Sequence, residues 1–423
     1  MIKILTCALV VIIFLICPFV LADNSRLNYS IMDKIEEAKI LLQDLKLDHS
    51  GKLDTYEQSL VFGNNNPVIR YYRDFTWKEL ALAILDLKTG NISVIKIRQQ
   101  IEVTENNRIK IKTKTKSGKT EIRWVAKKKK EAILENQNKN FEIEIEKRLS
   151  GLAWNQFNTP FVVKNPSGKI VIANKYPMPR GLDLAGKLKT KEIIYSSYNS
   201  SLHIKEVVSY GNEYFDKILS EVDSELKRKN VFSRAFPAKL VANLIPSLFI
   251  KRTILAEHID FDEFKNVKVP QKLVERVLII LGSNKKEAYS FTSSPKNAQG
   301  FAQFIKSTYD FIEKSYPEAE LDPRFLSGAV DHLNSLKAAY LLYDYNLAKL
   351  IQSFGESILE DPSLEEYLAA AYNGGVGRVI SAIKKSKNKG LKILNVLNSS
   401  QFFKLETIGY LEKIYFLKTI SLP

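Results

Sequence analysis

Residues 368–379 read Leu-Ala-Ala-Ala-Tyr-Asn-Gly-Gly-Val-Gly-Arg-Val, and this stretch decides how the C-terminal half of the chain is interpreted. The alanine-rich run favours a helix. Asn373 and the two glycines after it are typical of a helix end, because they accept the left-handed backbone of a C-cap. A second helix is expected from Val376. Tyr372 and Asn373 would then lie at a helix terminus, presented rather than packed.

The rest of the chain divides by its apolar periodicity. From about residue 205 to the end the spacing is helical, with proline and glycine punctuation. Residues 24 to about 90 are also interpreted as helical, including the apolar run Leu80–Ile84. Between about 91 and 200, apolar and polar residues alternate, which predicts half-buried strands. The predicted fold class is α+β: a signal peptide at 1–22, a helical N-terminal region at 23–90, a β-rich domain with an antiparallel sheet at 91–204, and a mostly helical domain at 205–423.

Three local patterns refine the β-rich region and its boundary. The turn residues Asn165–Gly168 lie between two apolar runs and predict a hairpin. Lysines between Lys110 and Lys130 are interpreted as a solvated sheet face, with a polyanion-binding face as the alternative. Asp48–Glu57 has the glycine of a calcium loop but puts Lys46 at the first ligand position, so a turn between helices is expected instead.

The first 22 residues predict where the protein acts. Lys3 precedes the apolar run Ile4–Leu21, which is typical of an export signal, and an uncleaved membrane anchor is the alternative. Both cysteines, Cys7 and Cys17, lie inside this segment, and the four histidines show no metal-ligand spacing. The formal charge of +16 favours polyanions. Export leaves anionic cell-wall polymer rather than nucleic acid as the expected partner, in the periplasm or cell envelope.

Two further segments of the helical half accompany residues 368–379. Residues 294–305 read Ser-Pro-Lys-Asn-Ala-Gln-Gly-Phe-Ala-Gln-Phe-Ile, and residues 406–411 read Glu-Thr-Ile-Gly-Tyr-Leu. Together the three segments resemble the signature of family-1 lytic transglycosylases, the soluble-lytic-transglycosylase or goose-lysozyme-like enzymes that cleave peptidoglycan. The resemblance covers about residues 235–420. It implies a lysozyme-like, mostly helical fold with a sugar-binding groove, and no metal or organic cofactor.

The resemblance implies four substrate-binding side chains. Gln303 falls on the groove glutamine of the family's S-x-x-G-A-x-G-L-M-Q stretch. Tyr372 and Asn373 fall on substrate-site positions of its A-Y-N-A-G-x-G-R-V stretch, and Tyr410 matches its late tyrosine. This sequence departs from the family at three places: Asn297 replaces a glycine, Phe301-Ala302 replace Leu-Met, and Gly374 replaces an alanine.

The catalytic acid is expected to be Glu257. Glycosidic cleavage needs a carboxylic acid that an apolar setting keeps protonated. The family places its glutamate at the end of an apolar helix, and Glu257 follows such a run. Because Glu257 lies 43 residues before Gly300, much farther than is usual in the family, an insertion must be accommodated. Glu287 is the rival, but its polar neighbours predict a solvated side chain.

The resemblance implies one carboxyl that acts twice. As an acid it would protonate the bond between N-acetylmuramic acid and N-acetylglucosamine, and as a base it would help the muramyl C6 hydroxyl close a 1,6-anhydro ring. A hydrolytic muramidase and a catalytically inactive peptidoglycan-binding scaffold are the alternatives. Peptidoglycan glycan strands are the expected partner, together with an envelope protein bound by the N-terminal region. Membrane contact is expected only through an uncleaved signal.

Overall fold

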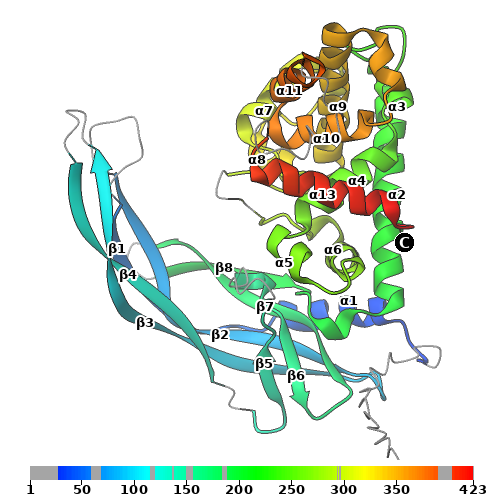
Figure 1. The fold of residues 1–423 in the computed structure, drawn as a ribbon. Helices are drawn as coiled ribbons and strands as arrows, with labels where there is room; N and C mark the ends of the chain where they lie inside the picture. Colours follow the sequence, from blue (N-terminus) through cyan, green and yellow to red (C-terminus); the bar gives the residue numbers. More distant parts are fainter. Residues whose placement is uncertain are drawn as a thin grey trace, which may run out of the picture.

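The structure is a computed structural model that describes residues 27–58, 68–114, 120–135, 138–148, 156–182, 188–292, 294, 297–388 and 403–422. A helical body is joined to a long, curved antiparallel sheet, as Figure 1 shows. The expected α+β class is therefore confirmed at the level of its elements. The predicted signal segment at 1–22 lies outside the described residues.

The described residues of the N-terminal half form the α-helix α1 and two sheets. The main sheet has the order β4-β3-β2-β7-β8, with β1 also paired to β2, and a second sheet consists of β5 and β6. All of these pairs are antiparallel. The elements are α1 (Ile31–Gln43), β1 (His49–Gln58), β2 (Val68–Asp86), β3 (Ile92–Lys114), β4 (Thr120–Glu135), β5 (Glu142–Ile145), β6 (Phe161–Asn165), β7 (Lys169–Leu182) and β8 (Leu188–Tyr195).

Among the described residues between 24 and 90, the expected helix is found only at α1, and the apolar run before residue 86 is part of the strand β2. Leu80 to Leu85 are at most 1% exposed, and α1 packs across β2 and β7. A strand that is buried on both faces has no polar alternation, so its sequence does not distinguish it from a buried helix. The turn expected over Asp48–Glu57 is likewise wrong, because β1 occupies it.

The predicted turn at Asn165–Gly168 is present, but the strands on its two sides do not form a hairpin. β6 pairs with β5 in the small sheet, whereas β7 pairs with β2 and β8 in the main sheet. Turn residues specify that the chain reverses, but they do not specify which strand each arm pairs with. The side chains of the lysine-rich strands between Lys110 and Lys130 lie outside the described residues.

The C-terminal half is helical from Lys205 onward, as predicted. Its long helix α9 is buried along most of its length and forms the centre of the body. The helices are α2 (Lys205–Arg228), α3 (Val241–Leu244), α4 (Ser247–His258), α5 (Phe261–Asn266), α6 (Gln271–Asn284), α7 (Lys306–Ser315), α8 (Phe325–Val330), α9 (His332–Phe354), α10 (Leu364–Gly374), α11 (Val376–Asn388) and α13 (Leu405–Thr419), with the short 3-10 turn η3 (Lys285–Glu287) after α6.

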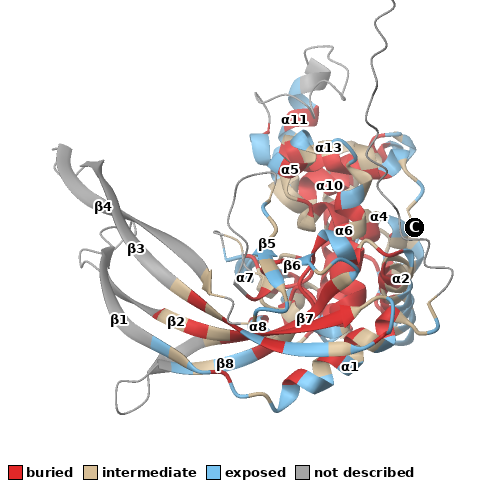
Figure 2. Cartoon of the chain, turned by 90° about the horizontal axis from the view of Figure 1, so that it is seen from below, coloured by how far each residue is buried: buried red, intermediate tan, exposed pale blue. Residues whose placement is uncertain are grey.

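Polar contacts hold the helical body on the main sheet. Glu206 at the start of α2 accepts hydrogen bonds from the Ser30 hydroxyl at 2.6 Å and from the Ile31 backbone N–H at 3.2 Å. At the end of α6 the Asn284 amide bonds both the N–H and the carbonyl of Ser196, at 2.8 and 2.9 Å. Figure 2 shows the buried residues gathered where β7 and α1 meet the helices.

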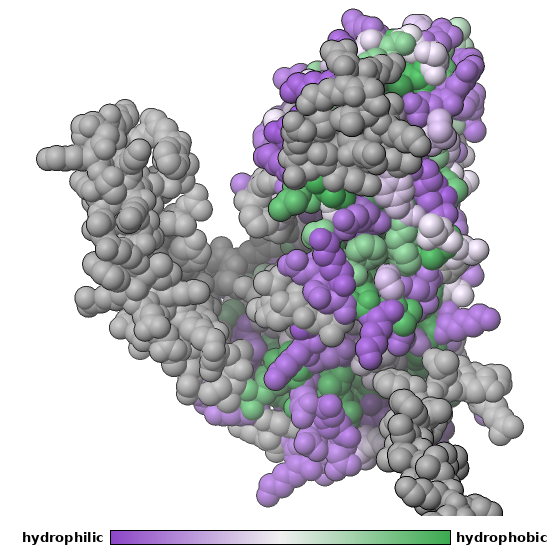
Figure 3. Space-filling model, in the orientation of Figure 1, coloured by the Kyte–Doolittle hydropathy of each residue, from purple (hydrophilic) through white to green (hydrophobic). Residues whose placement is uncertain are grey.

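The surface of the body is mixed in polarity. On the face shown in Figure 3, hydrophilic and hydrophobic residues are interspersed over the coloured part of the helical body. In the part of the chain that the structure describes, no helix has the length and apolar character needed to span a bilayer.

Candidate active site

The turn after Tyr372 has the predicted form. α10 ends at Gly374, Gly375 has a φ of +91°, and α11 begins at Val376. Tyr372, however, is half-buried rather than presented to solvent. Its hydroxyl donates to the Ala302 carbonyl at 2.6 Å. The second of the three sequence segments is thereby fastened to the first.

The first segment is a tight loop between η3 and α7. Three of its residues have left-handed backbone: Asn297 at φ +60°, Gly300 at +71° and Gln303 at +50°. A Cβ on Gly300 would lie 1.8 Å from the Ala329 carbonyl oxygen, so only glycine fits there. The Gln303 side chain folds back, and its amide donates to the Gly300 carbonyl at 2.7 Å.

Two departures from the family signature fit this loop. Asn297 stands where the family has glycine, and asparagine is among the residues that best tolerate the left-handed conformation. Phe301 stands in place of leucine, is fully buried, and stacks on His332 with ring centroids 4.4 Å apart. The His258 Nε2–H donates to the Phe301 carbonyl at 2.7 Å. The loop is therefore bonded to the last residue of α4.

Glu257 lies at this end of α4 and is half-buried. Burial raises the pKa of Tyr372 well above its ordinary value, and the charge of Glu257 adds to that rise. Burial and then Glu257 act in the same direction on the pKa of Tyr410. Glu257 is thus within electrostatic range of two tyrosines that the sequence assigned to the same site.

The third segment, on α13, contacts α4 and the second segment. The Tyr410 hydroxyl donates to the Thr253 carbonyl of α4 at 3.1 Å. The Thr407 hydroxyl donates to the Asn373 side-chain oxygen at 2.9 Å. A Cβ on Gly374 would lie 3.1 Å from that hydroxyl, a tight contact that an alanine would make only if the Thr407 side chain shifted slightly. Thr407 was not predicted as a site residue, although it lies inside the quoted segment.

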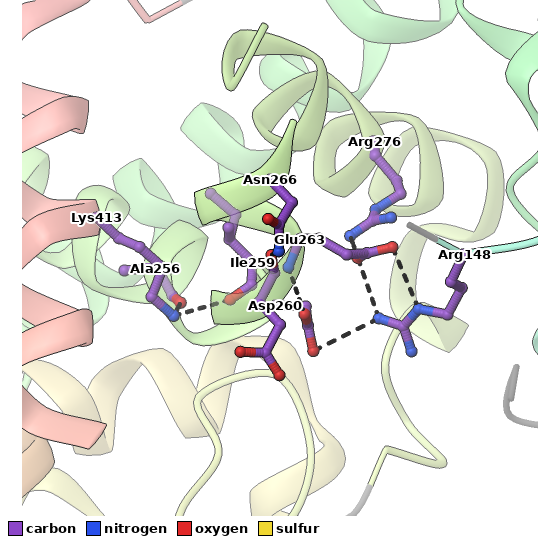
Figure 4. A network of polar contacts seen from close by, with 9 residues as sticks. Arg148, Ala256, Ile259, Asp260, Glu263, Asn266, Arg276 and Lys413 are labelled. Carbon is purple, nitrogen blue, oxygen red and sulfur yellow. Dashed lines mark hydrogen bonds and ion pairs between the residues drawn. The ribbon is translucent and has the colours of Figure 1, made fainter. Parts of the chain in front are cut away.

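Lys413 is a second residue that the sequence did not indicate. It lies one turn beyond Tyr410 on α13 and is 7% exposed. Its ammonium group donates to the carbonyls of Ala256 and, at 2.8 Å, Ile259, on the two sides of Glu257 along the chain. Figure 4 shows this side chain reaching the end of α4.

Glu287, the rival acid, is placed differently. It is exposed on η3, as its polar neighbours predicted. It borders a depression of about 690 Å³ whose wall includes Asp322, Asp331 and Lys191.

Another open depression, of about 810 Å³, borders the loop that carries Gln303, and its lining combines amides, cations and apolar side chains: Asn297, Gln299, Ile305, Lys306, Ser307, Arg324, Phe325 and Leu326.

The residues between Glu257 and Gly300 form α5 and α6, which account for the large spacing. Glu263 of α5 is 2% exposed and pairs with Arg276 of α6 at 2.6 Å and with Arg148 at 3.2 Å. Arg148 follows β5 and also lies 3.9 Å from Asp260 (Figure 4). Helices α5 and α6 thus link the end of α4 to the β-rich region.

Two histidines stack on the Phe301 ring: His332, which is buried, and His258, which is half-buried. Burial lowers the pKa of His258 to about 3 and that of His332 to about 4, with the carbonyls that they bond opposing the shift. Both are therefore neutral at pH 7. Among the described residues, no group of three or more His, Cys, Asp or Glu side chains is placed to hold a metal ion.

No family model matches this chain, and neither a curated protein nor a solved structure shows significant similarity to it.

Proposed function

We propose that the chain is an exported peptidoglycan lytic transglycosylase with a lysozyme-like catalytic domain in its helical half. One observation carries the proposal. Segments spread along the chain from residue 257 to residue 410, which bear Glu257, Gln303, Tyr372 and Tyr410, meet near the end of α4 through hydrogen bonds and electrostatic interactions. A purely structural role does not require that the residues matching one enzyme signature also gather around one carboxyl.

Glu257 is the acid and base in this proposal. Carboxylic acids among apolar groups can hold a proton near neutral pH. Glu257 is half-buried, and its charge adds to the rise in the pKa of both Tyr372 and Tyr410. Its proton passes to the glycosidic oxygen as the bond to muramyl C1 breaks. The carboxylate then takes the proton of the C6 hydroxyl as O6 bonds to C1, so no water is consumed.

The other residues hold the sugar chain. Gln303 and Asn373 carry side-chain amides at the rim of the site and can bond sugar hydroxyls. The depression beside the Gln303 loop offers exposed Ile305 and Leu326 next to polar groups. That combination suits saccharides, whose rings have apolar faces and polar edges. Periplasmic or envelope location, and binding of an envelope partner by the β-rich region, belong to the same proposal.

Digestion of purified peptidoglycan tests the function, with the soluble products identified by mass spectrometry. Glu257→Gln is compared with Glu287→Gln, an exposed glutamate that serves as the matched control. We expect muropeptides ending in 1,6-anhydro-muramic acid from wild type and Glu287→Gln, and none from Glu257→Gln. Reducing-end products would instead indicate a hydrolytic muramidase. Wall binding without products would indicate a non-catalytic scaffold, and loss of activity only in Glu287→Gln would refute the assignment of the acid.

A further inference from the structure

We propose that Lys413 is a positioning residue of this site, which fixes the last turn of α4 and supplies the cation that faces Glu257. The catalytic meaning of the inference rests on the proposed function, whereas the hydrogen bonds of Lys413 to the end of α4 and its electrostatic interaction with Glu257 do not. Lys413 is outside the four substrate-binding positions that the resemblance implies.

The geometry of the contact is that of a helix cap. α4 ends at His258, so the Ala256 carbonyl is one of the last four, which have no partner within the helix. The Lys413 ammonium bonds this carbonyl and that of Ile259. A cation at a helix C-terminus also interacts favourably with the helix dipole. Lys413 therefore holds the backbone on both sides of Glu257.

Tyr410 extends this clamp by one turn. Tyr410 and Lys413 are three residues apart on α13, so they project from one face of that helix. The Tyr410 hydroxyl bonds the Thr253 carbonyl, one turn before Ala256 on α4. Two consecutive turns of α4 are thus held by one face of α13, and Glu257 projects from the second of them.

Of the charged groups around Lys413, Glu257 has the largest effect on the Lys413 pKa. Burial lowers the pKa of Lys413, and the negative charges of Glu257, Asp260 and Glu406 oppose this, with Glu257 the strongest of the three. His258 does not compete, because burial keeps its pKa at about 3. Tyr410 and Tyr372 are neutral at ordinary pH, since burial raises the pKa of each. The main ionic neighbour of Lys413 is Glu257.

This arrangement suits an acid that must also act as a base. When Glu257 gives its proton to the glycosidic oxygen, a carboxylate is left in a half-buried site. The Lys413 ammonium stabilises that carboxylate until it takes the C6 hydroxyl proton. Lys413 itself neither gives nor takes a proton in either step.

Enzyme kinetics give the first test. Lys413→Gln keeps a donor for the carbonyls but removes the charge, and Lys413→Arg keeps the charge. In Lys413→Gln, we expect the alkaline limb of the pH profile of kcat/KM to move up by about one pH unit, and kcat to change by a larger factor than KM. In Lys413→Arg, we expect the limb to stay in place. Lys337→Met is the control, because Lys337 is a buried lysine of α9 paired with Glu225 at 3.0 Å. An unmoved limb in folded Lys413→Gln would overturn the inference.

NMR titration of the Lys413 ammonium gives a second test that needs no activity. Because Glu257 raises the pKa of Lys413 against burial, Glu257→Gln should lower the Lys413 midpoint further, while Glu287→Gln should leave it unchanged. An unchanged midpoint in Glu257→Gln would refute the contact whether or not the protein cleaves peptidoglycan. A shifted midpoint in a protein that yields no muropeptides would leave the contact standing and refute the function.

Discussion

Acidification from pH 7 to pH 5 is expected to remove about 4 kcal/mol from the free energy of unfolding, through His258 and His332. The unfolded chain takes up protons at these positions near the ordinary histidine pKa of about 6.5. The folded pKa values are about 3 and about 4. Because the folded values are lowered, the stabilisation is fully present above pH 6.5 and is lost as the pH falls toward 4 and then 3.

The magnitude follows from the distance between pH 5 and the unfolded pKa. That distance is about 1.5 units, and each unit is worth about 1.36 kcal/mol, so each histidine contributes about 2 kcal/mol. The structural cause is specific. His332 is 3% exposed and its Nε2–H donates to the Ala288 carbonyl at 2.7 Å, while the His258 ring stacks on Tyr289 with centroids 3.7 Å apart.

Urea unfolding at pH 7, 6 and 5 measures this loss. His258→Gln and His332→Gln retain an amide donor without a titrating ring, so each variant should lose only about half as much stability over the same range. Differences between wild type and each variant isolate the two histidines from other groups, such as His203, whose pKa burial also lowers. The reasoning would be refuted by variants that keep the full wild-type pH dependence.

Three substitutions test the packing. Gly300→Ala should abolish activity and lower the free energy of unfolding, measured by thermal unfolding, by about 2 kcal/mol or more, because its Cβ would lie 1.8 Å from the Ala329 carbonyl oxygen. Gly377→Ala is the control and should cost far less, because a Cβ there meets nothing within 4 Å. Gly211→Ala should cost about 1–3 kcal/mol in urea unfolding, because its Cβ would lie 2.0 Å from a backbone oxygen of α6, and a smaller loss would show that α2 and α6 can separate freely. Arg276→Ala should lower the free energy of unfolding in urea by about 3 kcal/mol, because it weakens the pairing of the buried Glu263 carboxylate. If the loss comes from that carboxylate, the double variant with Glu263→Gln should recover part of the lost stability.

The sequence predicted those parts of the fold whose signals are local. The end of α10 follows from Asn373 and the two glycines after it, and the structure has its turn there. The strand β2 was mistaken for a helix because the residues that define it, Leu80 to Leu85, are buried on both faces and carry no alternation. The pairing of β6 with β5 could not be inferred, since strand partners are a non-local property.

In the candidate site, too, residues with a local sequence signal could be predicted, and residues whose role depends on distant partners could not. Glu257, Tyr372 and Tyr410 could be named because each lies in or beside a segment with a recognisable order of residues. Lys413 could not be named, because a lysine in a helix is ordinarily solvated, and the carbonyls that it bonds are 157 and 154 residues away. Arg148 was missed for the same reason, with its partner Glu263 115 residues downstream.

The clamp that α13 places on α4 sets an order of events during synthesis. The bond from Tyr410 to Thr253 joins positions 157 residues apart, so a ribosome that adds about 5–20 residues per second makes its second half roughly 8–30 s after the first. Until then, the carbonyls of α4 that Tyr410 and Lys413 bond lack these donors, and Glu257 lacks the Lys413 cation near it. A nascent chain therefore passes through a period in which most of its helices exist and its candidate site is not yet assembled, and a chain cut between α11 and α13 would stay in that condition permanently.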